Sequence, residues 1–136
     1  MQKDSVRAFK NELRNYNYYL SQIVSLENSI EFLYDRLGGV RGVDPSKEPT
    51  HSLPNKELEY KLRDDIERLE RKKASVEAKA KEIDRTLSFM EEEIRYAIMC
   101  VYANGKQVKY MSDKMYLSPS GLVLRMNKAI ERALNG

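Results

Sequence analysis

The sequence predicts an all-α protein: a long antiparallel coiled-coil helical hairpin followed by a C-terminal helix-turn-helix. Apolar residues recur every three or four positions along two long stretches, which is the spacing of one helix face. Three of the six glycines and three of the four prolines lie between the two stretches, where they predict a loop. Near the C-terminus, Ser118-Pro119 is typical of a helix start and separates two short amphipathic segments. We therefore expect two domains, residues 1–88 for the hairpin and residues 89–136 for the helix-turn-helix.

The first stretch predicts one helix from Ser5 to Leu37, with Asp4 or Ser5 as its N-terminal cap. Its apolar stripe comprises Val6, Phe9, Leu13, Tyr16, Leu20, Ile23, Leu26, Ile30, Leu33 and Leu37. Gly38-Gly39 is expected to end the helix, and residues 38–54 are expected to connect it to the next one. Because so long a helix is unstable by itself, its stripe must pack against a partner.

The second stretch predicts a helix that is capped by Asn55 and carries a heptad seam interrupted only by Lys73. The pattern continues to Val101, but Ser88 with Glu91 three residues later is a capping-box sequence, so we expect a break near Ser88. The two stripes can fold back on each other as an antiparallel pair. Because the first stripe is wider than one partner helix covers, we also expect a homodimer through the coiled coil.

Three shorter helices are expected in the C-terminal domain. Residues 89–102 form the first, with an acidic first turn that suits the helix dipole, and Asn104-Gly105 ends it. A helix of about three turns is expected from Gln107, and Ser118 is expected to cap the last helix, with Pro119 at its first position. The apolar side of the last helix comprises Leu122, Met126, Ala129, Ile130 and Ala133.

A short helix, a tight turn and a second helix that opens with Ser-Pro suggest a helix-turn-helix, a motif whose second helix enters the major groove of DNA. The outward side of this last helix comprises Ser120, Gly121, Leu124, Arg125, Lys128 and Arg132. Its first turn is small and uncharged, which lets the backbone approach DNA, and basic residues follow. The alternative is a helical hairpin that only packs, with its charges in water.

The positive charge of the chain is concentrated in this region. The formal net charge is +3, yet residues 103–136 alone carry six basic and two acidic side chains. Residues 1–54 are balanced, with seven of each kind, and residues 55–102 carry eleven basic and twelve acidic side chains. A cationic surface at the helix-turn-helix favours binding to phosphates.

The docking geometry of helix-turn-helix proteins assigns the candidate DNA-binding residues. Ser120, Leu124 and Arg125 are expected to contact bases, Arg125 through the bidentate pairing with guanine that is the commonest specific contact. The remaining candidates are the helix-start residue Ser118 and the expected phosphate contacts Lys106, Lys109, Lys114, Lys128 and Arg132.

A family resemblance rests on two runs: Leu117-Ser118-x-Ser120-Gly121-Leu122 and Arg125-Met126-x-Lys128-Ala129-Ile130-x-Arg132-Ala133-Leu134. They resemble the C-terminal DNA-reading domain of bacterial sigma factors. With the long helices upstream, the chain resembles the ArpU/RinA-type family of small phage and prophage transcriptional regulators. The resemblance implies a promoter-binding activator of late phage genes, with RNA polymerase as a further candidate partner. Tyr110 replaces an acidic residue of the pattern and Gly121-Leu122 replaces Thr-Val, which leaves the base preference open.

The sequence carries no enzyme signature, since it has no phosphate-binding loop and no nucleophile paired with a base. The single cysteine, Cys100, and the single histidine, His51, cannot make a structural zinc site, so we expect no metal and no cofactor. Without a membrane span or a signal peptide, we expect a cytoplasmic protein of a bacterial host cell, with no membrane partner.

Two other functions remain open. A small terminase subunit also combines a helix-turn-helix with helical oligomerisation, and it would assemble as a ring. A protein-interaction module would use the coiled coil as its working part and would not bind DNA.

Overall fold

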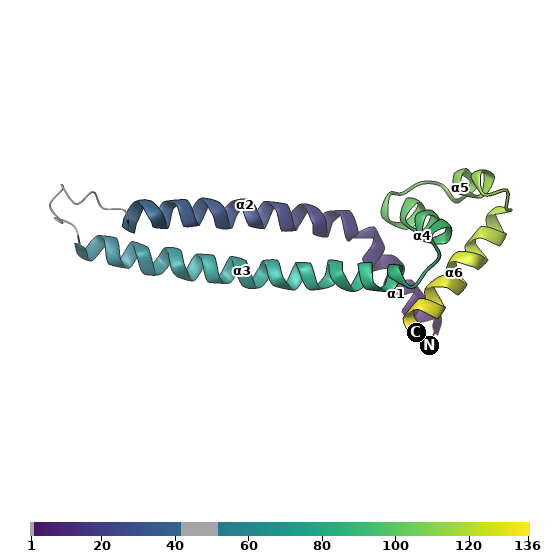
Figure 1. The fold of residues 1–136 in the computed structure, drawn as a ribbon, viewed down its shortest axis with the longest axis horizontal. Helices are drawn as coiled ribbons and strands as arrows, with labels where there is room; N and C mark the ends of the chain where they lie inside the picture. Colours follow the sequence, from purple (N-terminus) through teal and green to yellow (C-terminus); the bar gives the residue numbers. More distant parts are fainter. Residues whose placement is uncertain (1, 42–51) are drawn as a thin grey trace. The chain divides into compact units, whose positions relative to one another are not determined.

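The computed structural model describes residues 2–41 and 52–136, and all secondary structure in these residues is helical, which confirms the predicted all-α class. The helices are α1 (Gln2–Arg14), α2 (Tyr16–Arg41), α3 (Ser52–Ser88), α4 (Glu92–Ile98), the π-helix η1 (Met99–Ala103), α5 (Val108–Lys114) and α6 (Pro119–Asn135) (Figure 1). None of these helices, within the described residues, is both long and apolar enough to cross a membrane.

The chain divides into two compact units. Unit 1 comprises residues 1–20 and 78–136, and unit 2 comprises residues 21–77. Unit 1 therefore contains α1, the first part of α2 and the last part of α3 together with α4, η1, α5 and α6, whereas the sequence suggested a boundary at residue 88. The difference arises because α1 packs against α6 and η1, a contact between distant parts of the sequence that no local pattern encodes.

The first predicted helix is in fact two helices, because the chain breaks at Asn15. The Asn15 N–H donates to Glu12 O at 3.1 Å, one residue nearer than its α-helical partner, and the Asn15 side-chain amide donates to Asn11 O at 3.2 Å. Asparagine often competes with helical hydrogen bonding in this way. The prediction of an unbroken helix from Ser5 to Leu37 is therefore wrong.

The ends of the two long helices also differ from the prediction. α2 continues through Gly38-Gly39 to Arg41, since a glycine inside a helix costs only about 1 kcal/mol relative to alanine. α3 begins at Ser52, so the predicted start of this helix at Asn55 is wrong. The rest of the predicted 38–54 connection, residues 42–51 with His51, lies outside the described residues.

The described residues of unit 2 form two helix segments that lie side by side, one from α2 and one from α3 (Figure 1). Its core comprises Ile30, Leu37, Leu62 and Ile66, with Leu33, Leu58 and Leu69 packed against it. Lys73, the interruption of the predicted seam, lies 3.4 Å from the Glu27 carboxylate, and Tyr34 donates a hydrogen bond to Glu70 at 2.9 Å. This order of pairing means that the two segments run in opposite directions.

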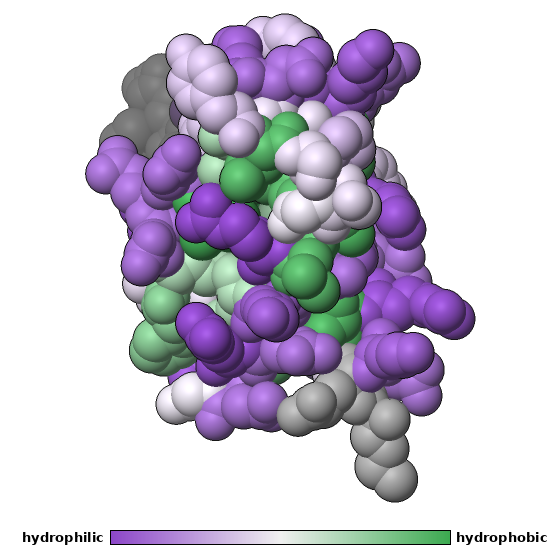
Figure 2. Space-filling view, turned by 90° about the vertical axis from the view of Figure 1, so that its right-hand side faces the viewer, coloured by the Kyte–Doolittle hydropathy of each residue, from purple (hydrophilic) through white to green (hydrophobic). Residues whose placement is uncertain are grey.

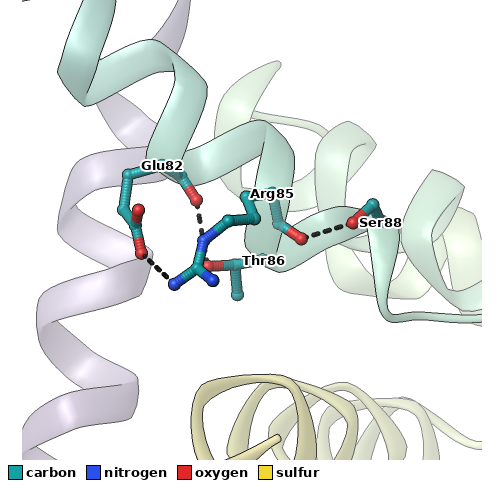
Figure 3. Close-up of polar contacts among 4 residues, drawn as sticks. All are labelled: Glu82, Arg85, Thr86 and Ser88. Atoms are coloured by element: carbon teal, nitrogen blue, oxygen red, sulfur yellow. Dashed lines mark hydrogen bonds and ion pairs between the residues drawn. The ribbon is translucent and has the colours of Figure 1, made fainter.

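α3 ends at Ser88, so the predicted break at this point is confirmed. The predicted capping box is wrong, because Ser88 Oγ donates to the Arg85 carbonyl at 2.5 Å and thus closes the helix that ends there. Glu82 completes the same turn: its carbonyl accepts from the Thr86 hydroxyl and its carboxylate from the Arg85 guanidinium, each at 3.0 Å (Figure 3). α4 follows, and its N-cap residue Glu91 makes no side-chain capping hydrogen bond.

Unit 1 has a closed apolar core to which α1 contributes. Its most deeply buried large apolar side chains are Leu13, Ile98, Met111, Leu122, Met126 and Ile130. The predicted helix over residues 89–102 is divided into α4 and η1, where Asn104 N–H donates to Met99 O, five residues back, at 3.0 Å. The Asn17 side chain donates to Ala103 O at 3.2 Å, which satisfies a carbonyl at the end of η1.

Candidate nucleic-acid interface

α6 is positioned by its N-terminal cap and by its buried side. The Gly121 N–H donates to Ser118 Oγ at 3.0 Å and Pro119 occupies the first turn, so the predicted helix start is confirmed. A side chain at Gly121 would place its Cβ 2.9 Å from Ser118 Oγ, and the glycine therefore leaves room for the cap. The buried residues of α6 are Leu122, Met126, Ile130 and Ala133, and the predicted Ala129 is half-buried.

α5 is shorter than the predicted helix of about three turns. It spans Val108–Lys114 and ends because Tyr116 adopts a φ of 58°, a left-handed conformation that is uncommon for a large side chain. The Leu117 N–H then donates to Ser112 O at 2.9 Å. The connection between α5 and α6 is consequently a tight turn.

All the predicted contact residues at the start and on the outward side of α6 are accessible except Gly121, which is half-buried. The exposed ones are Ser118, Ser120, Leu124, Arg125, Lys128 and Arg132, and 56% of Leu124 is accessible. None of the three cations takes part in an ion pair within the described residues. Figure 2, which looks from the right-hand side of Figure 1, shows hydrophilic residues over much of this face, with smaller apolar areas among them. The cations of α6 are therefore free to bind an anion.

The three predicted cations of α6 meet at one hollow. Arg125, Lys128 and Arg132 line it from one side, and Phe89 and Glu91 line it from the segment that joins α3 to α4. Phe89 is 57% exposed, so the hollow combines an aromatic surface with three positive charges and one carboxylate. This combination suits a phosphate group beside an apolar one.

A second hollow lies between α6 and α1, and it contains cations that the sequence analysis missed. They are Lys3, Arg7, Lys10 and Arg14, which face Leu124, Asn127, Lys128 and Glu131 of α6. Lys128 lines both hollows and therefore lies on the ridge between them. The four cations of α1 recur at spacings of four, three and four, a signal that was visible in the sequence. The net charge of residues 1–54 does not reveal these cations, because seven acidic side chains in the same segment balance its seven basic ones.

The predicted lysines around α5 line neither hollow. Lys106 and Lys114 lie over the Tyr110 ring, with Nζ 5.9 Å and 4.6 Å from its centroid, and Lys109 is exposed. The hydrogen bond and the charge of Lys114 lower the pKa of Tyr110, and the same contact raises the pKa of Lys114. Tyr110 thus contacts two of the predicted phosphate-binding lysines.

Other chemistry on the described residues is limited. Cys100 is a free, buried thiol. No group of three or more His, Cys, Asp and Glu side chains in residues 2–41 and 52–136 could hold a metal ion. Asn127 Oδ1 is buried without a hydrogen-bond partner where α6 faces α1.

Comparisons with protein-family models, with curated proteins and with solved structures find no match for this chain. What the interface binds must therefore be inferred from its own residues.

Proposed function

We propose that the protein is a sequence-specific, double-stranded DNA-binding transcriptional regulator. In this proposal α5 and α6 form the helix-turn-helix, and α6 is the recognition helix. The observation that carries it is the exposed side of α6, where small uncharged residues are followed by Arg125, Lys128 and Arg132. Because the opposite side of α6 is buried, the helix is a rigid element of the width that a major groove, about 12 Å wide, admits.

Each contact residue has a proposed role. Ser120, Leu124 and Arg125 lie on the first half of α6, which reaches base edges in helix-turn-helix complexes. An exposed leucine suits the methyl group of thymine, and arginine suits the two acceptors of guanine. Lys128 and Arg132 follow on the second half and bind phosphates, together with the lysines near α5.

The second part of the proposal is a homodimer formed through α2 and α3 as a coiled coil, which would present two copies of α6 to two half-sites. It is supported by two apolar side chains of unit 2 that lie in water, Val24 and Phe32, which are 56% and 60% exposed. They line a hollow with Leu33 and Leu69, and a second chain would cover it. Light scattering is expected to give the mass of two chains, whereas a ring of many chains would favour a small terminase subunit.

The resemblance to ArpU/RinA-type regulators supports a regulatory role at promoters of late phage or prophage genes. Activation by direct contact with RNA polymerase is part of the same proposal. A reporter gene behind a selected binding site tests the sign of regulation, since the proposal requires expression to rise when the protein is present.

Selection of bound sequences from random duplex DNA tests whether the protein reads sequence. The proposal requires a motif to be enriched over successive rounds. If the full-length chain retains no duplex even at about 50 mM salt, where phosphate contacts are strongest, the proposal fails and a protein-interaction module is favoured.

Arg125→Ala is expected to flatten the sequence preference, because a bidentate arginine–guanine pair discriminates against the wrong base by about 1–3 kcal/mol. The measurement is competition between the selected duplex and a scrambled one. The matched control is Arg132→Ala, which should weaken both duplexes equally because phosphates carry no sequence information. Full retention of the preference in the Arg125 variant would exclude a base contact by this residue.

A further inference from the structure

We infer that α1 is an additional DNA-contacting element of unit 1, and that its cationic side binds phosphates of the strand bordering the groove that α6 enters. The inference rests on the proposed function, because it assumes that α6 is the helix in the groove. It assigns a ligand to four side chains, Lys3, Arg7, Lys10 and Arg14, that the helix-turn-helix itself does not include.

The cationic side of α1 is held open towards solvent by the packing of the helix. Val6, Phe9 and Leu13 of α1 are 6%, 7% and 0% exposed, so the apolar side is fixed in the core of unit 1. Lys3, Arg7 and Arg14 are exposed and form no ion pair within the described residues. Their positions are therefore set by the fold, while their charges remain uncompensated.

Lys10 and Arg14 are partly engaged within the protein. Lys10 is half-buried, with Nζ 5.0 Å from the centroid of the Tyr102 ring. Arg14 donates to Asn11 Oδ1 at 2.7 Å, a contact that leaves its guanidinium with further donors. Lys3, Arg7 and Arg14 are thus the cations best able to bind phosphates.

The dimensions of packed helices and of DNA support this placement. Helices that pack against each other have axes about 8–10 Å apart, whereas the major groove is about 12 Å wide. A helix packed beside one that lies in the groove is therefore placed over the groove edge, where the phosphates are. Lys3 to Arg14 spans roughly 16 Å of helix, comparable with the rise of about five nucleotides of one strand.

Acidic neighbours do not neutralise this side of the molecule. The nearby carboxylates are Asp4 and Glu12 on α1 and Glu131 on α6. Glu12 accepts a hydrogen bond from the Tyr19 hydroxyl at 2.7 Å, and Glu131 lines the hollow beside Lys128. Four cations of α1 and Lys128 thus outnumber three carboxylates, and an anionic ligand is favoured.

An anionic membrane is the other large polyanion that a basic amphipathic helix can bind. Such binding inserts the apolar side of the helix into the lipid boundary. In α1 that side consists of Val6, Phe9 and Leu13, which are buried within unit 1 and unavailable. The accessible side of α1 is mainly polar and charged, and rigidly spaced charges without an apolar face fit the phosphates of a duplex better.

The test is the salt dependence of duplex binding by the full-length chain. The variant Arg7→Gln with Arg14→Gln removes two proposed phosphate contacts. The control Arg36→Gln with Lys72→Gln removes the same charge from exposed positions of unit 2. Log K falls with log salt, and each lost phosphate contact reduces the magnitude of this slope by about 0.9. The slope of the α1 variant should therefore be smaller in magnitude by about 1.8, and that of the control should be unchanged. The base preference should be unchanged in both.

The possible outcomes separate the two proposals. If the wild-type chain binds no duplex, the proposed function fails and this inference fails with it. If the wild type binds and the variant Arg7→Gln with Arg14→Gln keeps the wild-type slope, as the control does, only the role of α1 fails. Loss of binding to phosphatidylserine vesicles in the α1 variant, with an unchanged duplex slope, would overturn the inference in favour of a membrane.

A second variant, Lys3→Gln with Arg7→Gln, guards against a folding defect at Arg14. It is expected to lose the same slope while its thermal unfolding matches that of the wild type. A wild-type slope in this folded variant would equally overturn the inference.

Discussion

The two units of the molecule differ most clearly in charge. Unit 1 contains fourteen basic and nine acidic side chains, a net charge of +5, whereas unit 2 contains ten basic and twelve acidic ones, a net charge of −2. The modest +3 of the whole chain conceals this division. Attraction to a polyanion is therefore expected to reside in unit 1, and removal of cations from unit 2 should not weaken it.

The units differ in packing as well. In unit 1, side chains from several helices meet in a closed core, and Leu122, Met126 and Ile130 are 0% exposed. In unit 2 the described residues form two helix segments, which do not enclose all of their apolar residues, and Phe32 remains 60% exposed. Unit 1 is thus suited to hold a surface in a fixed shape, while unit 2 has an apolar surface left for a partner.

The sharpest test of the closed core compares two leucines of α6. Leu122→Ala should lower the free energy of unfolding by about 2–5 kcal/mol, because it leaves a cavity in a fully buried site. Leu124→Ala removes the same atoms from an exposed site and should change it by less than about 0.5 kcal/mol, while weakening duplex binding. Urea unfolding followed by far-UV circular dichroism measures both, and equal losses would contradict the described core.

A smaller effect is expected from two tyrosine–carboxylate hydrogen bonds, one in each unit. The Tyr16 hydroxyl donates to Asp84 at 2.6 Å in unit 1, and the Tyr34 hydroxyl donates to Glu70 at 2.9 Å in unit 2. Tyr16→Phe should destabilise the protein by about 1 kcal/mol at neutral pH. Tyr34 is 50% exposed, so Tyr34→Phe should have the smaller effect in the same thermal unfolding assay. The reverse order would contradict the comparison.

The Tyr16 contact also predicts a dependence on pH. Partial burial, and then the hydrogen bond and charge of Asp84, raise the pKa of Tyr16 from 10.0 to about 12. Because the folded state holds the proton more tightly than the unfolded state, the stabilisation is complete below pH 10 and is lost as pH rises through about 12. The stability difference between wild type and Tyr16→Phe should shrink over this range. A difference that stays constant would show that Tyr16 ionises normally.

The smallest effect is expected in unit 2, at the lysine that interrupts the apolar seam. Lys73 Nζ lies 3.4 Å from Glu27 and 3.7 Å from Glu77, and its side chain is 29% exposed. Because such pairs contribute little and a polar seam residue reduces stability, Lys73→Met should stabilise the protein by about 0.5–1 kcal/mol without changing duplex binding. The control is Lys72→Met, an exposed neighbour expected to have no effect. Destabilisation by Lys73→Met would show that the carboxylate pairs outweigh the seam.

Features encoded by neighbouring residues could be predicted from the sequence. The all-α class, the cap of α6 by Ser118, the break near Ser88 and the buried side of α6 all follow from side chains within a few positions of one another. The outcome of competition between alternative local hydrogen bonds could not be predicted in the same way. The break at Asn15 and the role of Ser88 depended on which of two available hydrogen bonds the backbone adopted, and the sequence contains both options.

The sequence by itself determined where helices form and which sides of them are apolar, because helical periodicity and capping are local properties. It also determined the cations of α6 and the spacing of those on α1. Only the tertiary structure decided that α1 packs beside α6, so that the cations of α1 and Lys128 of α6 line one hollow. The reason is that such a contact joins residues far apart in the sequence, and the burial of apolar side chains from both helices, such as Leu13 and Leu122, is a property of the assembled core.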